Sequence, residues 1–280
     1  MSMHDVHTSL PTVAFIGGGN MARSLIGGLL QAGGDANKVH VAEPVAELRD
    51  ALAHDFRVHT FEDAAQAATG ADVWVLAVKP QVLRDVCAAL APIAQAQRPL
   101  VVSIAAGITG EQIDRWLGGG IAVVRCMPNT PAMLGAGVTG LHANTATTNA
   151  QRDIAQVLLS SAGKTVWVDD ESLMDAVTAV SGSGPAYVFL LAEAMQVAGE
   201  AEGLPPDAAR TLTIETLLGA ARMLTADDTP AAELRRRVTS PNGTTQAAIE
   251  SFEANGFRDI VAKAVHAARV RGAELAAAND

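Results

Sequence analysis

A cluster of three glycines follows a strand-like segment near the start of the chain. Residues 12–16 have the composition of a strand, and Gly17, Gly19 and Ala22 match the G-x-G-x-x-[GA] pattern of dinucleotide-binding turns. In that chemistry the first glycine permits a tight strand-to-helix turn, the second lets a pyrophosphate approach the backbone, and the small third residue lets the helix pack closely. Amides at the start of the helix then attract the anion. The segment predicts a dinucleotide site, and a plain glycine turn is the alternative.

Two charged residues come directly after predicted strands, at the edge where parallel sheets bind their ligands. Glu43 follows the strand at 38–42, where an acidic side chain accepts hydrogen bonds from the adenosine ribose hydroxyls. A phosphorylated ribose would be repelled by this carboxylate, and the nearest basic residue after it is Arg49. Lys79 follows the strand at 71–78, and we expect it to help fix the cofactor. The alternative for both side chains is a solvent-exposed position near the start of a helix.

Three other segments carry polar groups suited to a small ligand. Asn129 and Thr130 follow the strand at 121–126 and stand between two prolines, where simple turn chemistry is the alternative. Residues 181–187 form a glycine-serine turn ahead of a long apolar helix. Residues 240–245 open another helix, where free amides and threonine hydroxyls form an anion site of the right size for a carboxylate. Helix capping alone is the alternative for this last segment.

The order of predicted elements separates the chain into two parts. Strands and helices alternate up to about residue 168, which predicts an α/β fold with a doubly wound parallel sheet of Rossmann type. Strands are predicted at 12–16, 38–42, 58–61, 71–78, 100–104 and 121–126, with edge strands at 138–142 and 164–168. After Asp169 only helices are predicted, at 172–180, 184–203, 206–226, 231–238, 244–254 and 257–278. We therefore predict a flexible tail at 1–11, a Rossmann-type dinucleotide-binding domain at 12–168, and an all-α dimerisation and substrate domain at 169–280.

The composition argues against several classes of protein. The 280 residues carry a formal net charge of −10, which disfavours nonspecific binding to nucleic acid or to an anionic membrane. Cys87 and Cys126 are the only cysteines, which favours a reducing compartment and buried, unreactive thiols. No apolar run has the length of a membrane span, and residues 1–11 lack an apolar core of signal-peptide length. We therefore expect a cytoplasmic protein, and we expect no metal site.

Several helices of the second part are apolar around much of their circumference. A helix that is apolar on all sides has to be buried. Six helices are too few to bury all of this surface against one another, so we predict a homodimer formed by the helical part. The alternative is a tight monomeric bundle.

Six segments together resemble pyrroline-5-carboxylate reductase, the last enzyme of proline synthesis. They follow the family's order and spacing from residue 12 to about 271, namely Phe15–Met21, Ala77–Pro80, Ser103–Gly107, Met127–Pro131, Val180–Tyr187 and Ser240–Thr245. The resemblance implies NADPH or NADH as cofactor, 1-pyrroline-5-carboxylate as substrate, and interlaced homodimers that form higher rings in some members. Implied cofactor-binding residues are Ile16, Gly17, Gly18, Gly19, Asn20, Met21, Ala77, Val78, Lys79 and Pro80.

The same resemblance implies a hydride transfer from the nicotinamide to the C5 carbon of a cyclic imine. Thr245 corresponds to the threonine that lies close to the ring nitrogen, and we expect it to act as the catalytic residue. Because a protonated imine is already electrophilic, the protein would act mainly by positioning the two rings. Other expected substrate-binding residues are Ser181, Ser183, Ser240, Asn242, Gly243 and Thr244, and Asn129 and Thr130 are expected to flank the nicotinamide.

Two positions depart from the family's pattern, and two rival functions stay open. Asn242 stands where the family usually has the first of two glycines, but asparagine tolerates a left-handed backbone, so the turn survives. Glu43 stands where many relatives carry a serine or a basic residue, which favours NADH or use of both cofactors. A hydroxy-acid dehydrogenase would need a lysine base within 184–203, which contains none. A noncatalytic dinucleotide-binding module would have no need of the turn at 240–245.

Overall fold

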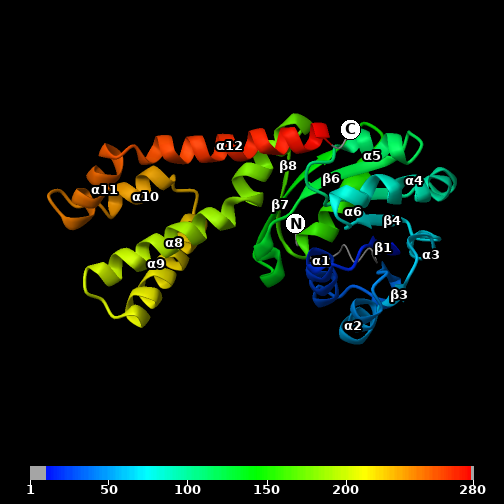
Figure 1. Ribbon diagram of the computed structural model, residues 1–280, viewed down its shortest axis with the longest axis horizontal. Coiled ribbons are helices and arrows are strands. Elements are labelled where there is room, and N and C mark those ends of the chain that lie inside the picture. Colours follow the sequence, from blue (N-terminus) through cyan, green and yellow to red (C-terminus); the bar gives the residue numbers. More distant parts are fainter. Residues whose placement is uncertain (1–10, 279–280) are drawn as a thin grey trace. The chain divides into compact units, whose positions relative to one another are not determined.

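Eight strands form a single sheet in the first part of the chain (Figure 1). The computed structural model describes residues 11–278, so the expected tail at 1–11 lies, apart from Pro11, outside the described residues. The strands are β1 (Val13–Ile16), β2 (Val39–Ala42), β3 (His59–Phe61), β4 (Val73–Leu76), β5 (Leu100–Ser103), β6 (Ala122–Met127), β7 (Gly137–Ala143) and β8 (Gly163–Trp167). Their order across the sheet is β3-β2-β1-β4-β5-β6-β7-β8. This order places the ends of β1, β2 and β4 side by side, where the glycine cluster, Glu43 and Lys79 follow.

The sheet is parallel from β3 to β6, and its last two strands run the other way. Val13 of β1 pairs with Val39 of β2 and with Val73 of β4, which sets the parallel register around the glycine turn. By contrast, β7 is antiparallel to β6, and β8 is parallel to β7. The reversal arises because only the short turn η2 (Thr130–Leu134) connects β6 to β7, whereas a parallel pair needs a crossover of a dozen or more residues. The predicted α/β sheet is confirmed, with β7 and β8 as a reversed extension.

Helices cover both faces of the sheet and complete two apolar cores (Figure 1). Along β1, Val13 and Phe15 face one core while Ala14 and Ile16 face the other, because successive strand residues point to opposite sides. One face carries α1 (Asn20–Gln31), α2 (Ala46–Phe56) and α6 (Asn149–Ser160), and the other carries α3 (Ala64–Ala68), α4 (Pro80–Gln97) and α5 (Gly110–Trp116). The strands that position the candidate site are therefore rigidly held from both sides.

The helices after the sheet begin within the first compact unit. The first unit comprises the chain up to Ser183 together with the residues from Ala268 onwards. The second unit comprises Gly184–Ala267. The segments η3 (Glu171–Leu173), α7 (Met174–Val177) and η4 (Thr178–Gly182) belong to the first unit. Val177 packs so closely on β7 that a Cβ added to Gly140 would lie 2.4 Å from its Cγ1. The compact units therefore divide later than the expected boundary at 168–169, which marks instead the end of the last strand.

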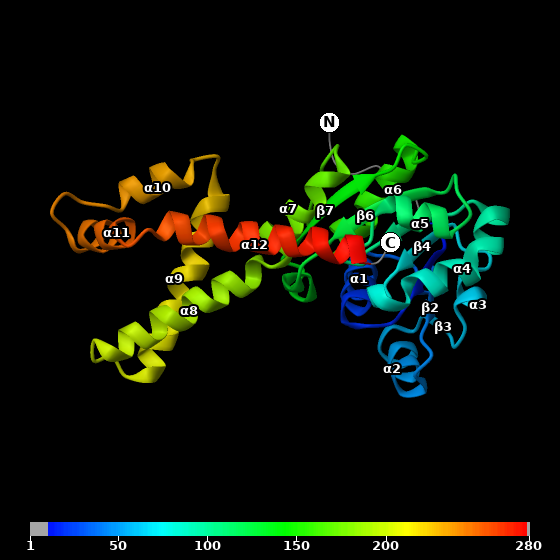
Figure 2. The same ribbon diagram turned by 45° about the horizontal axis from the view of Figure 1, so that its top comes forward.

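The second unit contains helices α8 (Gly184–Ala201), α9 (Pro206–Ala226), α10 (Ala231–Arg237), α11 (Thr244–Ala254) and most of α12 (Phe257–Ala278). The helices α8 and α9 lie side by side, as both ribbon views show (Figures 1 and 2). The ranges predicted for α9, α11 and α12 are confirmed to the residue. In residues 184–267 only Ala209 and Thr213 are buried, while Phe189 and Leu190 are each 66% exposed. Among the described helices none is long and apolar enough to cross a membrane.

Candidate functional site

The glycine turn between β1 and α1 is tight and leads into a helix without a side-chain cap. Gly17 has a φ of +109°, and a Cβ there would lie 2.7 Å from the carbonyl oxygen of Ala77. At Gly19, by contrast, a Cβ would meet no atom within 4 Å. Gly17 is thus required by the fold itself, whereas the open space at Gly19 leaves room for a ligand to approach the backbone. Gly19 is the N-cap of α1 with no side-chain cap, so the first amides of the helix are available to an anion.

Glu43 points into this turn. Glu43 is only 7% exposed. Its carboxylate accepts hydrogen bonds from the amides of Gly18 at 3.2 Å and Val45 at 3.0 Å. The position follows from the sheet, because β2 lies next to β1 and the two strands end together. The alternative that Glu43 faces solvent is wrong.

The segment after β4 lies against the same turn. The amide of Ala77 donates to the carbonyl of Ile16 at 2.9 Å, and a Cβ on Gly17 would also lie 3.1 Å from the amide nitrogen of Val78. Lys79 is exposed at the N-cap of α4, and Pro80 starts that helix. The structure thus brings the turn, Glu43 and the segment 77–80 together, while a contact of Lys79 with the cofactor stays a prediction.

Asn129 joins two of the expected segments through its side chain. Its Oδ1 accepts from the amide of Val138 at 3.0 Å, and its Nδ2 donates to the carbonyl of Ser181 at 3.1 Å. The side chain is nearly buried, at 9% exposure, whereas Thr130 is exposed at the start of η2. Asn129 therefore joins the segment after β6 to Ser181, which is more than the simple turn chemistry considered above.

The serines of that turn lie in a distorted stretch of helix. Residues Thr178–Gly182 form a π-helical turn, a rare conformation often found at functional sites. The hydroxyl of Ser181 donates to the carbonyl of Val177 at 2.8 Å, and the amide of Ser183 donates to the carbonyl of Thr178 at 2.8 Å. Contacts of Ser181 and Ser183 with a substrate stay predictions.

The turn at 240–245 begins helix α11 in the second unit. Asn242 has a φ of +59°, which confirms that asparagine takes the left-handed conformation here. Its amide donates to Oε1 of Gln246 at 2.7 Å, and the amide of Gly243 donates to the carbonyl of Ser240 at 3.1 Å. These two amides are therefore engaged within the turn, contrary to the expectation that both are open to a carboxylate.

The first helical turn of α11 offers the remaining donors. Gly243 is its N-cap and no side chain caps it, so the capping alternative for the threonines does not apply. The amides of the first residues of a helix have no acceptor within the helix, which leaves those of Thr244, Thr245 and Gln246 directed at the helix N-terminus. The expected donors were the amides of Asn242, Gly243 and Thr244, so the revised set lies two residues further along the chain.

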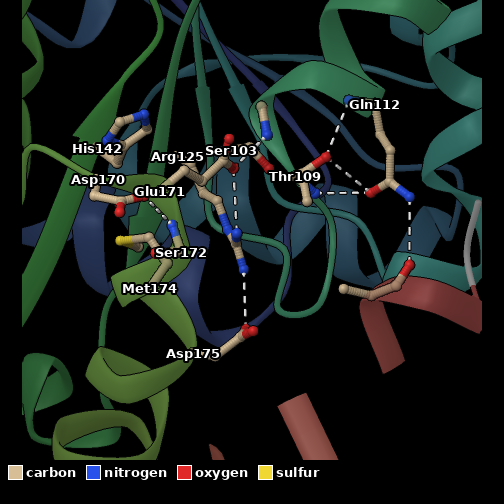
Figure 3. Close-up of polar contacts among 12 residues, drawn as sticks. Ser103, Thr109, Gln112, Arg125, His142, Asp170, Glu171, Ser172, Met174 and Asp175 are labelled. Atoms are coloured by element: carbon tan, nitrogen blue, oxygen red, sulfur yellow. Dashed lines mark hydrogen bonds and ion pairs between the residues drawn. The ribbon is translucent and has the colours of Figure 1, made fainter. Parts of the chain in front are cut away.

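A buried ionic cluster at the end of β6 was missed by the sequence analysis (Figure 3). Arg125 is 5% exposed, and its guanidinium lies 3.2 Å from Oε1 of Glu171 and 3.6 Å from Oδ1 of Asp175. Glu171 also accepts from the amide of Gly110 at 2.6 Å. Because a buried arginine needs such partners, the cluster fastens η3 and α7 to the sheet. The sequence signal that could have indicated this cluster is Arg125 itself, a single basic residue inside an otherwise apolar strand.

The two cysteines are buried on the sheet and its helices. Both thiols are free and buried, as predicted, and burial raises the pKa of Cys87 to about 12 and that of Cys126 further. Thiols with such pKa values carry almost no thiolate at neutral pH. Within residues 11–278, no three or more His, Cys, Asp or Glu side chains gather as they would around a metal ion.

Comparisons with known proteins agree with this geometry. Residues 171–275 match the family model described as "Pyrroline-5-carboxylate reductase dimerisation", and residues 12–107 match one described as "NADP oxidoreductase coenzyme F420-dependent". Pyrroline-5-carboxylate reductase from Pseudomonas aeruginosa is 54% identical over 96% of this chain and 98% of its own length. The enzyme of the same name from Vibrio alginolyticus is 43% identical over 94% of this chain and 97% of its own.

Solved structures show the same likeness. A pyrroline-5-carboxylate reductase from Coxiella burnetii matches with a TM-score of 0.92 and 42% identity, over 95% of this chain and 98% of its own. The pyrroline carboxylate reductase of Plasmodium falciparum, solved with NADP bound, matches with a TM-score of 0.84 and 26% identity, over 96% and 99% of the two chains. A 3-hydroxyisobutyrate dehydrogenase from Mycobacterium tuberculosis matches at 20% identity over 70% of this chain and 67% of its own, with a TM-score of 0.51, which shows a shared fold alone.

Proposed function

The chain belongs to the pyrroline-5-carboxylate reductase family, and we propose that its glycine turn binds the cofactor while the start of α11 binds the substrate. The chain is an NAD(P)H-dependent oxidoreductase that reduces 1-pyrroline-5-carboxylate to L-proline, the last step of proline biosynthesis. Bound NAD(P)H supplies the hydride in this reaction. The residues of the chain bind the two molecules, orient them and stabilise the charge that moves.

The cofactor-binding half of the proposal is supported by the open space at Gly19. A backbone that can be approached within contact distance, at the uncapped start of a helix, fits a pyrophosphate. We assign the segments 16–21 and 77–80, together with Glu43, to the cofactor, because these three elements lie around one turn. Asn129 and Thr130 would flank the nicotinamide, with Asn129 acting by holding the Ser181 turn.

The substrate-binding half rests on one observation, the uncapped first turn of α11 behind the left-handed Asn242. We propose that the amides of Thr244, Thr245 and Gln246 bind the substrate carboxylate, and that Ser240, Asn242 and Gly243 act by shaping the turn. The Thr245 hydroxyl would hydrogen-bond the ring nitrogen. As the new C5–H bond forms, the π electrons of the C=N bond move onto that nitrogen. The rate gain would come mainly from positioning.

The exposed apolar helices support a homodimer. The family model that matches residues 171–275 describes dimerisation, and the second unit alone buries only two of its residues. We propose that a second copy of the chain covers this surface, in a homodimer or in a ring of such dimers. We also propose a cytoplasmic location, supported by two buried cysteines that are both reduced.

Initial-rate oxidation of NADH and of NADPH with 1-pyrroline-5-carboxylate tests the function directly. Turnover that depends on the imine and yields proline is expected. Binding of the cofactor without turnover would favour the noncatalytic module instead. Turnover with a small 2-hydroxy acid and not with the imine would favour a hydroxy-acid dehydrogenase.

A further inference from the structure

The carboxylate of Glu43 is held against the glycine turn by two backbone amides. The amide of Gly18 donates to Oε2 at 3.2 Å and the amide of Val45 donates to Oε1 at 3.0 Å. The carboxylate lies close to the backbone of the turn, since a Cβ added to Gly18 would lie only 3.2 Å from Oε2. An ionised carboxylate accepts hydrogen bonds and donates none. This end of β2 is therefore built to receive hydroxyl donors, such as those of an unphosphorylated ribose.

The nearby guanidinium of Arg49 is already committed to the protein. Its Nη1 donates to the carbonyl of Glu43 at 2.8 Å and to that of Pro44 at 3.2 Å, and its Nη2 lies 3.8 Å from Oε2 of Glu62. The Arg49 side chain is 20% exposed. Its guanidinium thus braces the loop that carries Glu43. An arginine bound to two carbonyls would have to break these bonds before it could pair with a phosphate.

The remaining charges around this loop are also unfavourable to an added phosphate. Glu47 lies exposed in the first turn of α2, and Glu62 follows β3, whose Phe61 accepts from the amide of Glu43 at 2.9 Å. The segments that follow β2 and β3 therefore carry the acids Glu43, Glu47 and Glu62, and the nearby Arg49 is already engaged by two carbonyls. The 2′-phosphate of NADPH would add roughly two negative charges beside them at neutral pH.

We propose that Glu43 makes this enzyme select NADH over NADPH, and that Arg49 is the residue that positions it. The inference rests on the proposed cofactor site at the glycine turn. This preference would differ from the cofactor named in two of the matches, since the family model for residues 12–107 and the Plasmodium falciparum structure both name NADP. A hydrogen bond to a charged group is worth about a 10- to 100-fold change in affinity, so we expect NADH to bind at least about 10-fold more tightly.

Equilibrium binding tests this without turnover. The purified full-length protein is titrated with NADH and with NADPH, followed by nicotinamide fluorescence, and with ADP-ribose and its 2′-phosphate as competitors. A lower Kd for the unphosphorylated member of both pairs supports the proposal. Equal or tighter binding of the phosphorylated members overturns it, even if the enzyme reduces the imine. Binding of none of the four would instead contradict the proposed function.

Three variants identify the residues responsible. Glu43→Gln keeps an acceptor for the Gly18 amide but removes the charge, and should reduce the NADH preference to about 3-fold or less. Asp50→Asn, an exposed acid further along α2 that takes no part in these contacts, is the matched control and should leave the preference unchanged. Arg49→Ala should weaken NADH and leave NADPH little affected, because the brace on Glu43 is lost. A selective loss of NADPH in Arg49→Ala would show that Arg49 binds the phosphate and would overturn its assigned role. If Glu43→Gln fails to fold, the ratio measured on the unaltered protein decides.

Discussion

The two compact units of this chain are stabilised in different ways. In the first, sheet residues such as Phe15, Trp74 and Val102 are fully buried between layers of helices. Among the described residues of the second unit only Ala209 and Thr213 are buried. Many large apolar side chains of α8 and α9 are exposed. The comparison shows that the first unit contains its own core, whereas the second leaves most of its large apolar side chains exposed in the single chain, as the proposed homodimer requires. Large exposed apolar surfaces of this kind are typical of sites where another protein surface binds.

The two units nevertheless build their candidate anion sites in the same way. Helix α1 starts from Gly19 and helix α11 from Gly243, and neither is closed by a side chain. Each site also depends on a left-handed residue just before the helix, Gly17 in one case and Asn242 in the other. Helices α5 and α6, which carry no expected site residue, are instead closed by capping boxes at Thr109 and Thr148.

The largest expected effect comes from placing a charge on the apolar surface of the second unit. Phe189 is 66% exposed in the single chain, and burying such a side chain contributes about 2–3 kcal/mol. A symmetric interface contains the change twice, so Phe189→Asp should raise the dimer Kd by about 10³-fold or more, with loss of activity. Light scattering across a dilution series measures this. Leu48→Asp on α2, at a residue that is 50% exposed, is the control and should change nothing. An undiminished dimer would show that α8 faces solvent in the assembly.

Removal of the Thr245 hydroxyl should abolish most of the turnover and leave the first unit intact. Loss of one hydrogen bond to the group whose charge changes in the transition state costs about 100- to 1,000-fold in kcat. Thr245→Ala should show this loss with an unchanged Kd for the cofactor, since the glycine turn is untouched. Ser251→Ala, an exposed serine further along α11, is the control. Turnover equal to that of the unaltered enzyme would remove Thr245 from the mechanism.

A methyl group at Gly19 should affect the ligand and not the fold. Because a Cβ there would meet no protein atom within 4 Å, Gly19→Ala should melt within about 2 °C of the unaltered protein. Its affinity for the dinucleotide should fall about 10-fold, because the methyl group occupies the space of the pyrophosphate. Gly17→Ala should instead destabilise the first unit, since its Cβ would overlap the carbonyl of Ala77. Full cofactor affinity in Gly19→Ala would place the pyrophosphate elsewhere.

The smallest effect is expected from a surface ion pair of the second unit. Side-chain hydrogen bonds from Arg236 and Arg237 lower the pKa of Glu233 to about 2. Because the folded pKa lies below the unfolded one, any stabilisation is present at neutral pH and is lost as the pH falls from about 4.5 towards 2. The pair lies at the surface and is screened by salt, so Glu233→Gln should shift Tm at pH 7 by less than about 2 °C. A larger shift would mean that association of the chains buries this pair.

Local sequence patterns determined which segments form strands and helices, and which positions need special backbone conformations. The ranges of α9, α11 and α12 were predictable because Pro206, Gly243 and Gly256 interrupt strongly helical segments. The glycine turn was predictable because its chemistry lies within a few adjacent residues. The left-handed Asn242 was predictable for the same reason.

Only the tertiary structure decided how distant segments meet. It turned Glu43 inward onto Gly18, joined Asn129 to Ser181, and paired Arg125 with Glu171 and Asp175. It also reversed β7 and returned the end of α12 to the first unit, where the carbonyl of Ala276 accepts from Gln112 at 3.3 Å. These contacts join residues that are tens of positions or more apart, and the pattern of residue types along a segment carries no information about the partner that lies opposite it in the fold.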